Sequence, residues 1–130
     1  MAVQVEPLGV TLSPFHITTS GTKVSPGVGL NSGKQFGELG VIVVVDGTFD
    51  TANYDIVVQT AANAAGPGNS GDWMDTNSRI NGVDAAGTYR IPVADPVIDK
   101  VRLKYVDHLF GATDITFTAT WVGDRLPVAI

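Results

Sequence analysis

The chain has 130 residues, of which 44% are hydrophobic and 16% charged, with a formal net charge of -5 and no cysteine. This length supports one domain with its own core and is too short for two. The missing cysteines exclude disulfide scaffolds and thiolate metal sites, and they fit assembly in a reducing cytoplasm. The acidic charge argues against a protein that wraps nucleic acid, and no apolar run is long enough to cross a membrane.

The surface is expected to be unusually neutral. The charged fraction lies well below the roughly one quarter typical of globular domains, and the chain contains 15 glycines. A positive mean hydropathy in a small protein without a membrane span indicates that apolar area stays exposed on the monomer and is covered by partners. We therefore expect a homo-oligomer.

The first third of the chain reads as short strands and loops. From Met1 to Pro14 apolar and polar residues alternate, with Pro7 as punctuation, which predicts an edge strand or an arm that lies on a neighbouring subunit. A short strand is expected over residues 16–20. Residues 25–40, rich in glycine and without a helical period, are expected to form a long loop.

The centre of the chain predicts two strands. Val41 to Val45 is apolar at every position, so we expect an inner strand covered on both faces. In the following strand, Ile56 and Val58 point to one side, while Asp55 and Gln59 point to the other. We expect this second face to meet something other than water, such as another subunit.

A flexible surface loop is expected over residues 61–72, followed by a half-formed strand that contains Trp73 and Ile80. The dipeptide Asn81-Gly82 predicts a tight reversal. Residues 87–93 then read as an edge or short strand because Pro92 cannot donate a ladder hydrogen bond.

The last third contains the clearest alternation. Residues 100–106 place Val101, Leu103 and Tyr105 inward, and residues 115–122 alternate apolar side chains with three threonines around a turn at 107–114. No window supports a helix of more than about two turns. We predict an all-β, single-domain, jelly-roll-like β-sandwich of seven to eight strands with long glycine-rich loops.

Three patterns hint at chemistry, and each is weak. His16 and Ser70 follow the order of a serine-protease triad, but a flexible polar loop explains Ser70 better. Carboxylates at Asp46, Asp50 and Asp55 offer hard oxygen ligands for Ca²⁺ without matching a known loop spacing, so turn capping is preferred. His108 has no metal-ligand partner at suitable spacing. We expect no catalytic residue, metal or cofactor.

The positive charge is concentrated on one stripe. Lys100, Arg102 and Lys104 share a strand face, which predicts a solvated surface or a salt-bridged contact with an acidic partner. Trp121 is in phase with core residues, whereas Trp73 is flanked by acidic residues after a flexible loop. Trp73 is therefore the candidate contact for a surface ligand.

The order of these features resembles the jelly-roll cement, or decoration, proteins of tailed-bacteriophage capsids. The resemblance spans the chain from about Gly37 onward and is carried by the runs GELG leading into VIVVVD with Phe49, DIVVQT, YRIP, VRLKY, and ITFTATWV before Asp124-Arg125. It implies a protein of the virion that sits on the outer capsid surface, commonly as a trimer. There it would bridge neighbouring major capsid protein subunits and stabilise the shell.

The two terminal segments are the expected contact regions because both are apolar, terminal and punctuated by proline. The candidate subunit or capsid contacts are Val3, Val5, Leu8, Val10, Leu12, Leu126, Val128 and Ile130. Two other functional classes stay open. One is a carbohydrate-binding jelly roll that uses Trp73 with Asn69 and Asn77, and the other is a small enzyme.

Overall fold

The structure is a computed structural model that describes residues 6–29, 35–49, 52–61, 73–94, 97, 100–109 and 114–126. Across these ranges it contains ten strands and no helix, and hence no helix long and apolar enough to cross a membrane. The strands are β1 Glu6–Thr11, β2 Phe15–Ile17, β3 Lys23–Val24, β4 Val28–Gly29, β5 Gln35–Thr48, β6 Asn53–Ala61, β7 Met74–Val83, β8 Gly87–Pro92, β9 Lys100–Leu109 and β10 Asp114–Leu126.

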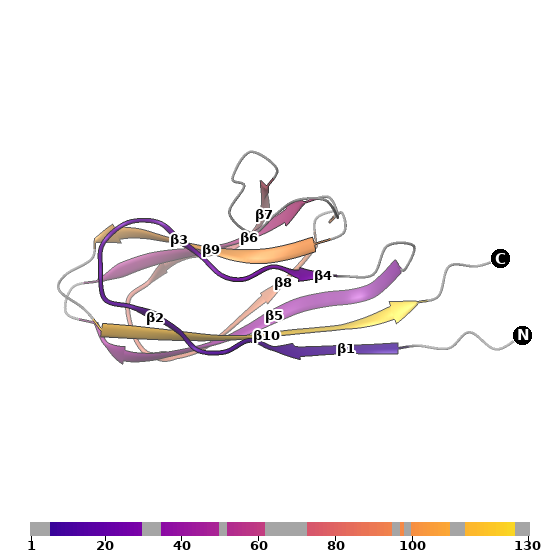
Figure 1. The fold of residues 1–130 in the computed structure, drawn as a ribbon, viewed down its shortest axis with the longest axis horizontal. Coiled ribbons are helices and arrows are strands. Elements are labelled where there is room, and N and C mark those ends of the chain that lie inside the picture. The colour runs from indigo at the N-terminus through magenta and orange to yellow at the C-terminus, as the bar shows by residue number, and fades with distance from the viewer. Residues whose placement is uncertain are drawn as a thin grey trace, which may run out of the picture.

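The strands form two antiparallel sheets that lie one above the other (Figure 1). Sheet A has the order β1-β10-β5-β8, with β2 also pairing with β10, and sheet B has the order β3-β9-β6-β7, with β4 also pairing with β9. Because β1 and β2 follow successive parts of β10, and β3 and β4 successive parts of β9, each sheet is effectively four strands wide. The expected all-β sandwich is confirmed.

The connections between the strands have the topology of a jelly roll. With β1 and β2 counted as one strand and β3 and β4 as another, the chain changes sheet at every connection except the one between β6 and β7. This alternation between two four-stranded sheets is the jelly-roll pattern. The strand number exceeds the expected seven to eight because two of the long edge strands are each split into two short pieces.

An aromatic stack joins the two sheets in the core. Phe117 of sheet A stacks on Tyr105 of sheet B with ring centroids 4.3 Å apart, and it meets Tyr54 edge-on at 5.7 Å. Phe15 lies 5.5 Å from Tyr105 on the other side. Rings in these arrangements add about 0.5 to 1.5 kcal/mol per pair beyond the burial of their area, so the stack fixes how the sheets face each other.

The alternation predicted for the last third is confirmed. The inward members of β9 and β10 are all buried, and they are Val101, Leu103, Tyr105, Ile115, Phe117, Ala119 and Trp121. β8 lies at the open edge of sheet A, as the proline in its sequence predicts. β1 likewise forms an edge strand beside β10, in agreement with the edge-strand interpretation of the N-terminal segment.

The expectation of one long loop over residues 25–40 is wrong. Ser25 donates its backbone N–H to the Leu103 carbonyl at 2.8 Å, and β4 then continues along β9. β5 begins at Gln35, which pairs with Leu126 at the far end of β10. Glycine did not prevent pairing here because the ladder with β10 supplies the hydrogen bonds.

The reversal expected at Asn81-Gly82 is also wrong, because both residues belong to β7. Gly82 has a φ of 74°, a left-handed conformation that glycine adopts easily, and its N–H donates to Asp55 Oδ1 at 3.0 Å. The dipeptide therefore forms an irregularity in the β6–β7 ladder. The chain bends afterwards, at residues 85 and 86.

Candidate functional site

The sandwich presents two outer faces, one on each sheet, and they differ in chemistry. We call "sheet A face" the outward residues of β1, β2, β5, β8 and β10, and "sheet B face" the outward residues of β6, β7 and β9. The sheet A face includes Gly9, Thr11, His16, Gly40, Ile42, Val44, Asp46, Thr48, Thr88, Arg90, Pro92, Asp114, Thr116, Thr118, Thr120 and Val122. The sheet B face includes Asp55, Val57, Gln59, Ala61, Asp75, Arg79, Lys100, Arg102, Lys104, Val106 and His108.

The centre of the sheet A face is uncharged and open. Val44 is 46% exposed, and it is one of two large hydrophobic side chains exposed within the described ranges, the other being Met74. Half-buried threonines of β10 surround it, and Thr120 shares a 3.0 Å hydroxyl hydrogen bond with Thr11 of β1. Threonine and valine favour a pleated surface and offer methyl groups with few charges. The centre of this face is therefore apolar and hydroxyl-bearing.

The charged residues of the sheet A face lie at its margins. His16 Nε2 and Asp114 Oδ1 are hydrogen-bonded to each other at the end where β2 meets β10. Asp46 accepts a hydrogen bond from the N–H of its neighbour Gly47 at 2.8 Å, and Arg90 is exposed on the edge strand β8. The margins are therefore polar around a neutral centre.

The run Val41 to Val45 is not covered on both faces, contrary to expectation. Val41, Val43 and Val45 are buried in the core, whereas Ile42 is half-buried and Val44 exposed. The chain's own described residues cover one face of this strand and leave the other accessible. Exposed apolar patches are common at interaction surfaces, so the accessible side of this strand is the candidate binding surface.

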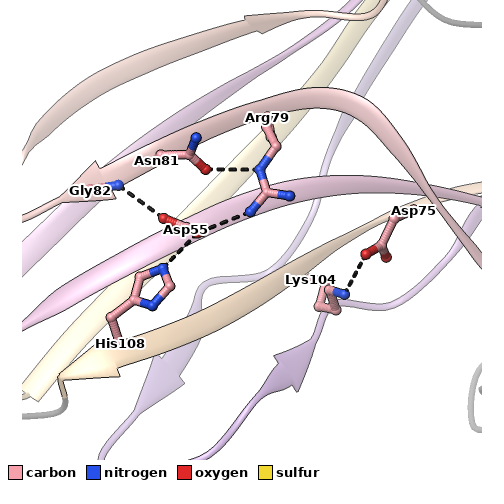
Figure 2. A network of polar contacts seen from close by, with 7 residues as sticks. All are labelled: Asp55, Asp75, Arg79, Asn81, Gly82, Lys104 and His108. Carbon is pink, nitrogen blue, oxygen red and sulfur yellow. Dashed lines mark hydrogen bonds and ion pairs between the residues drawn. The ribbon is translucent and has the colours of Figure 1, made fainter.

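A cluster around Asp55 occupies one end of the sheet B face (Figure 2). Asp55 Oδ2 accepts a hydrogen bond from Arg79 Nη2 at 2.9 Å and is bonded to His108 Nε2 at 2.6 Å, while Oδ1 accepts the Gly82 N–H. Burial by itself raises the pKa of this carboxyl, but the bonds from His108, Gly82 and Arg79 outweigh it and lower the pKa. The cluster ties β6, β7 and β9 together.

A second cluster continues the network along the same face. Asp75 accepts hydrogen bonds from Lys104 Nζ at 2.7 Å, drawn in Figure 2, and from Gln59 Nε2 at 2.8 Å. Gln59 Oε1 in turn accepts from Arg102 Nε at 2.7 Å. Desolvation raises the pKa of Asp75, yet the Lys104 and Gln59 bonds lower it overall. Both carboxylates of this face are thus occupied by donors of the chain itself.

Trp73 is not the exposed side chain that the sequence suggested. It is 6% exposed, and the Arg102 guanidinium lies over its ring at 4.3 Å from the centroid. Its edge abuts Gly27, where a Cβ atom would lie 3.1 Å from the indole, and it packs with Ala61. The cation–π contact and this packing leave no open ring face for a sugar to stack on.

The basic stripe on β9 is not a solvated surface either. Arg102 is 3% exposed, and its burial lowers its pKa. Lys104 finds its acidic partner in Asp75 of the same chain. Val57 of β6 lies in register between Arg79 and Lys104 and is buried, since long cationic side chains cover apolar surface with their stems. The polar face expected on β6 therefore meets the chain's own side chains.

The residues of the three weak chemical patterns are not brought together. Asp46 is on the sheet A face and Asp55 on the sheet B face, so the two cannot share a cation. His16 bonds to Asp114, and His108 to Asp55. Ser70 and Asp50 lie outside the described residues. The ranges that the structure describes contain no group of three or more side chains suited to hold a metal ion.

The predicted terminal contacts are described only in part. Val10 and Leu12 are partly buried and pack against the chain's own core, and Leu12 donates its N–H to the Ala119 carbonyl at 2.9 Å. For Leu8 and Leu126 the structure describes the backbone, in β1 and β10. Val3, Val5, Val128 and Ile130 lie outside the described residues. Their role in subunit or capsid contacts stays a prediction.

Sequence reasoning missed the network on the sheet B face, although a signal was present. Asp55 and Gln59 share the outward side of one strand, and Arg102 and Lys104 share that of another. These complementary groups point to pairing once β6 and β9 are known to be neighbours. Their adjacency, however, comes from the jelly-roll connections and not from local spacing.

No protein-family model matches the chain, and comparisons with curated proteins and with solved structures gave no match either.

Proposed function

We propose that the chain is a structural protein of a bacteriophage virion, a cement protein that binds the outer surface of the capsid as a trimer and stabilises the shell. It acts by bridging neighbouring subunits of the major capsid protein. It is assembled in the host cytoplasm and performs no catalysis. The observation that carries this proposal is the uncharged centre of the outer face of sheet A, where Val44 is exposed.

Three features support a binding role of this kind. The outer face of a central strand, β5, is apolar and open, as expected of a surface that has a partner. The formal charge of -5 favours the outside of a nucleoprotein particle over its nucleic acid. Asp55 and Asp75 on the sheet B face already accept hydrogen bonds from the chain's own donors, so the sheet A face is the one left available to a partner.

The mechanism would be the summation of weak contacts. A symmetric shell presents the same site many times, and a trimer engages several sites at once. Binding the second and third site is then intramolecular, so modest neutral interfaces hold firmly without strong charge pairs. Each bridge across two capsid subunits opposes their separation.

The carbohydrate-binding alternative is not favoured. Its aromatic platform was Trp73, and that ring is covered by Arg102 and Gly27. Asn77 is exposed on β7, whereas Asn69 lies outside the described residues. Without an open aromatic face, sugar stacking on this cluster has no support.

The test uses purified protein and empty shells, assembled without it from the major capsid protein of the virus that encodes the chain. We expect light scattering to give three times the chain mass of 13.6 kDa, saturable binding in sedimentation, and a higher melting temperature of the decorated shells. Shells that neither bind the protein nor gain stability would contradict the proposal.

A further inference from the structure

We infer that the sheet A face is the surface that docks on the shell, and that its partner is an uncharged, apolar and hydroxyl-bearing patch of the major capsid protein. This inference rests on the proposed function and specifies its interface. The termini, in contrast, would serve contacts within the trimer.

The layout of the face argues for a flat, neutral partner. Four rows of side chains cross the sheet, running through Val122, Thr120, Thr118 and Thr116 of β10. Val44 lies between Thr118 and Thr88 in the third row. The rows of Val122 and Thr118 carry no charge, whereas Arg90 lies in the row of Thr120, and His16 and Asp46 lie in the row of Thr116. The two uncharged rows fit an uncharged partner, since a charged group desolvated against them would lack a counter-ion.

The size of the face argues against a second copy of the chain as its occupant. Four strands spaced about 4.8 Å apart and four rows about 7 Å apart give an area on the order of 500 Å². A stable pairwise interface buries about 800 Å² on each partner. A face of this size suits a weak contact that becomes firm through repetition on a lattice.

The sheet B face does not compete for this role. Its central strand β6 is buried from Tyr54 to Ala61, and its charged groups pair within the chain. A partner docking there would have to replace these internal bonds. Met74, at the start of β7, is exposed and in register with Thr60, so it belongs to sheet B without being part of either outer face. It offers a site for a matched control.

The experiment compares Val44→Lys with Met74→Lys in the sedimentation assay on empty shells. Both substitutions place the same charge at an exposed hydrophobic position, one on each sheet. We expect Val44→Lys to weaken shell binding at least about tenfold, because the lysine is desolvated against an apolar partner. Met74→Lys should bind like the wild type. Thr118→Lys, in the neighbouring strand, provides an independent variant if Val44→Lys folds poorly.

Each outcome is decisive. Weaker binding by Val44→Lys or Thr118→Lys at unchanged trimer mass supports the inference. Wild-type affinity for both variants overturns it and leaves the proposed function standing. Loss of the trimer in Val44→Lys also overturns it, and assigns the face to a second copy of the chain. Failure of the wild-type protein to bind shells overturns the proposed function itself.

Discussion

The two outer faces of the sandwich differ in how far the chain's own side chains cover the central strand of each sheet. Each face contains the outward side chains of a central strand, β5 in sheet A and β6 in sheet B. The sheet B face closes over β6 with hydrogen-bonded long side chains, so that Val57 is 1% exposed. The sheet A face leaves Val44 open. Under the proposed function, the difference separates a face that the chain covers with its own side chains from a face that a partner covers.

The largest loss of stability is expected when the buried Trp73, which packs on sheet B, is truncated. Trp73→Ala should lower the free energy of unfolding by about 3 kcal/mol, since it deletes a buried ring and leaves a cavity beneath Arg102. Urea denaturation followed by circular dichroism measures it. Val44→Ala is the matched truncation on sheet A and should cost less than about 1 kcal/mol. Equal losses would erase the distinction between the faces.

Asp55→Ala should cost about 2 kcal/mol, because Arg79, His108 and the Gly82 N–H lose a common acceptor. The same urea titration applies. Asp46→Ala on the sheet A face, where the carboxylate is exposed and bonds its own neighbour, serves as the control and should cost far less. A cost no greater than that of the control would mean that the Asp55 cluster does not close the face.

The stability contributed by the sheet B face should also depend on pH. The folded-state pKa values of Asp55 and Asp75 are lowered from 3.8. Their stabilisation is therefore complete above the ordinary pKa and is lost as the pH falls through the lower folded values. Urea titrations between about pH 2.5 and pH 5 should show a smaller acid loss in the double variant Asp55→Asn/Asp75→Asn. An unchanged acid slope would contradict the assignment.

The smallest effect is expected on the stability of Val44→Thr. The side chain is half exposed, and both residues favour strands, so the free energy of unfolding should change by less than about 0.5 kcal/mol. Thermal unfolding checks this. A large loss would show that Val44 is part of the chain's own packing and not a surface kept for a partner.

The sequence was sufficient to predict the sheet class and the inward sides of β9 and β10. Period-two alternation determines which side of a strand is apolar, as Leu103 and Phe117 show. It does not determine what lies opposite. Val41 to Val45 has the pattern of a strand covered twice, and which of its sides is covered depends on a sheet formed by distant segments.

The burial of Arg102 and Trp73 was beyond local reasoning for the same reason. The residues next to each of them in the sequence suggest an exposed side chain. In the fold the Arg102 guanidinium lies over the Trp73 ring, and Arg102 Nε donates a hydrogen bond to Gln59 of β6. Their contact requires that β9 pair with β6 and that Trp73, immediately before β7, lie beside β9. Neither the composition nor the alternation of apolar residues along the chain shows which strands are neighbours.

The most direct test of the account uses the absence of cysteine in the chain. Val44→Cys and Met74→Cys each introduce a single thiol, one on each sheet, and the alkylation rate of each is measured in free and shell-bound protein. We predict that shell binding slows alkylation at position 44 and leaves position 74 unchanged. Protection at position 74 with a reactive thiol at position 44 would contradict the central claim that the sheet A face is the one kept for a partner.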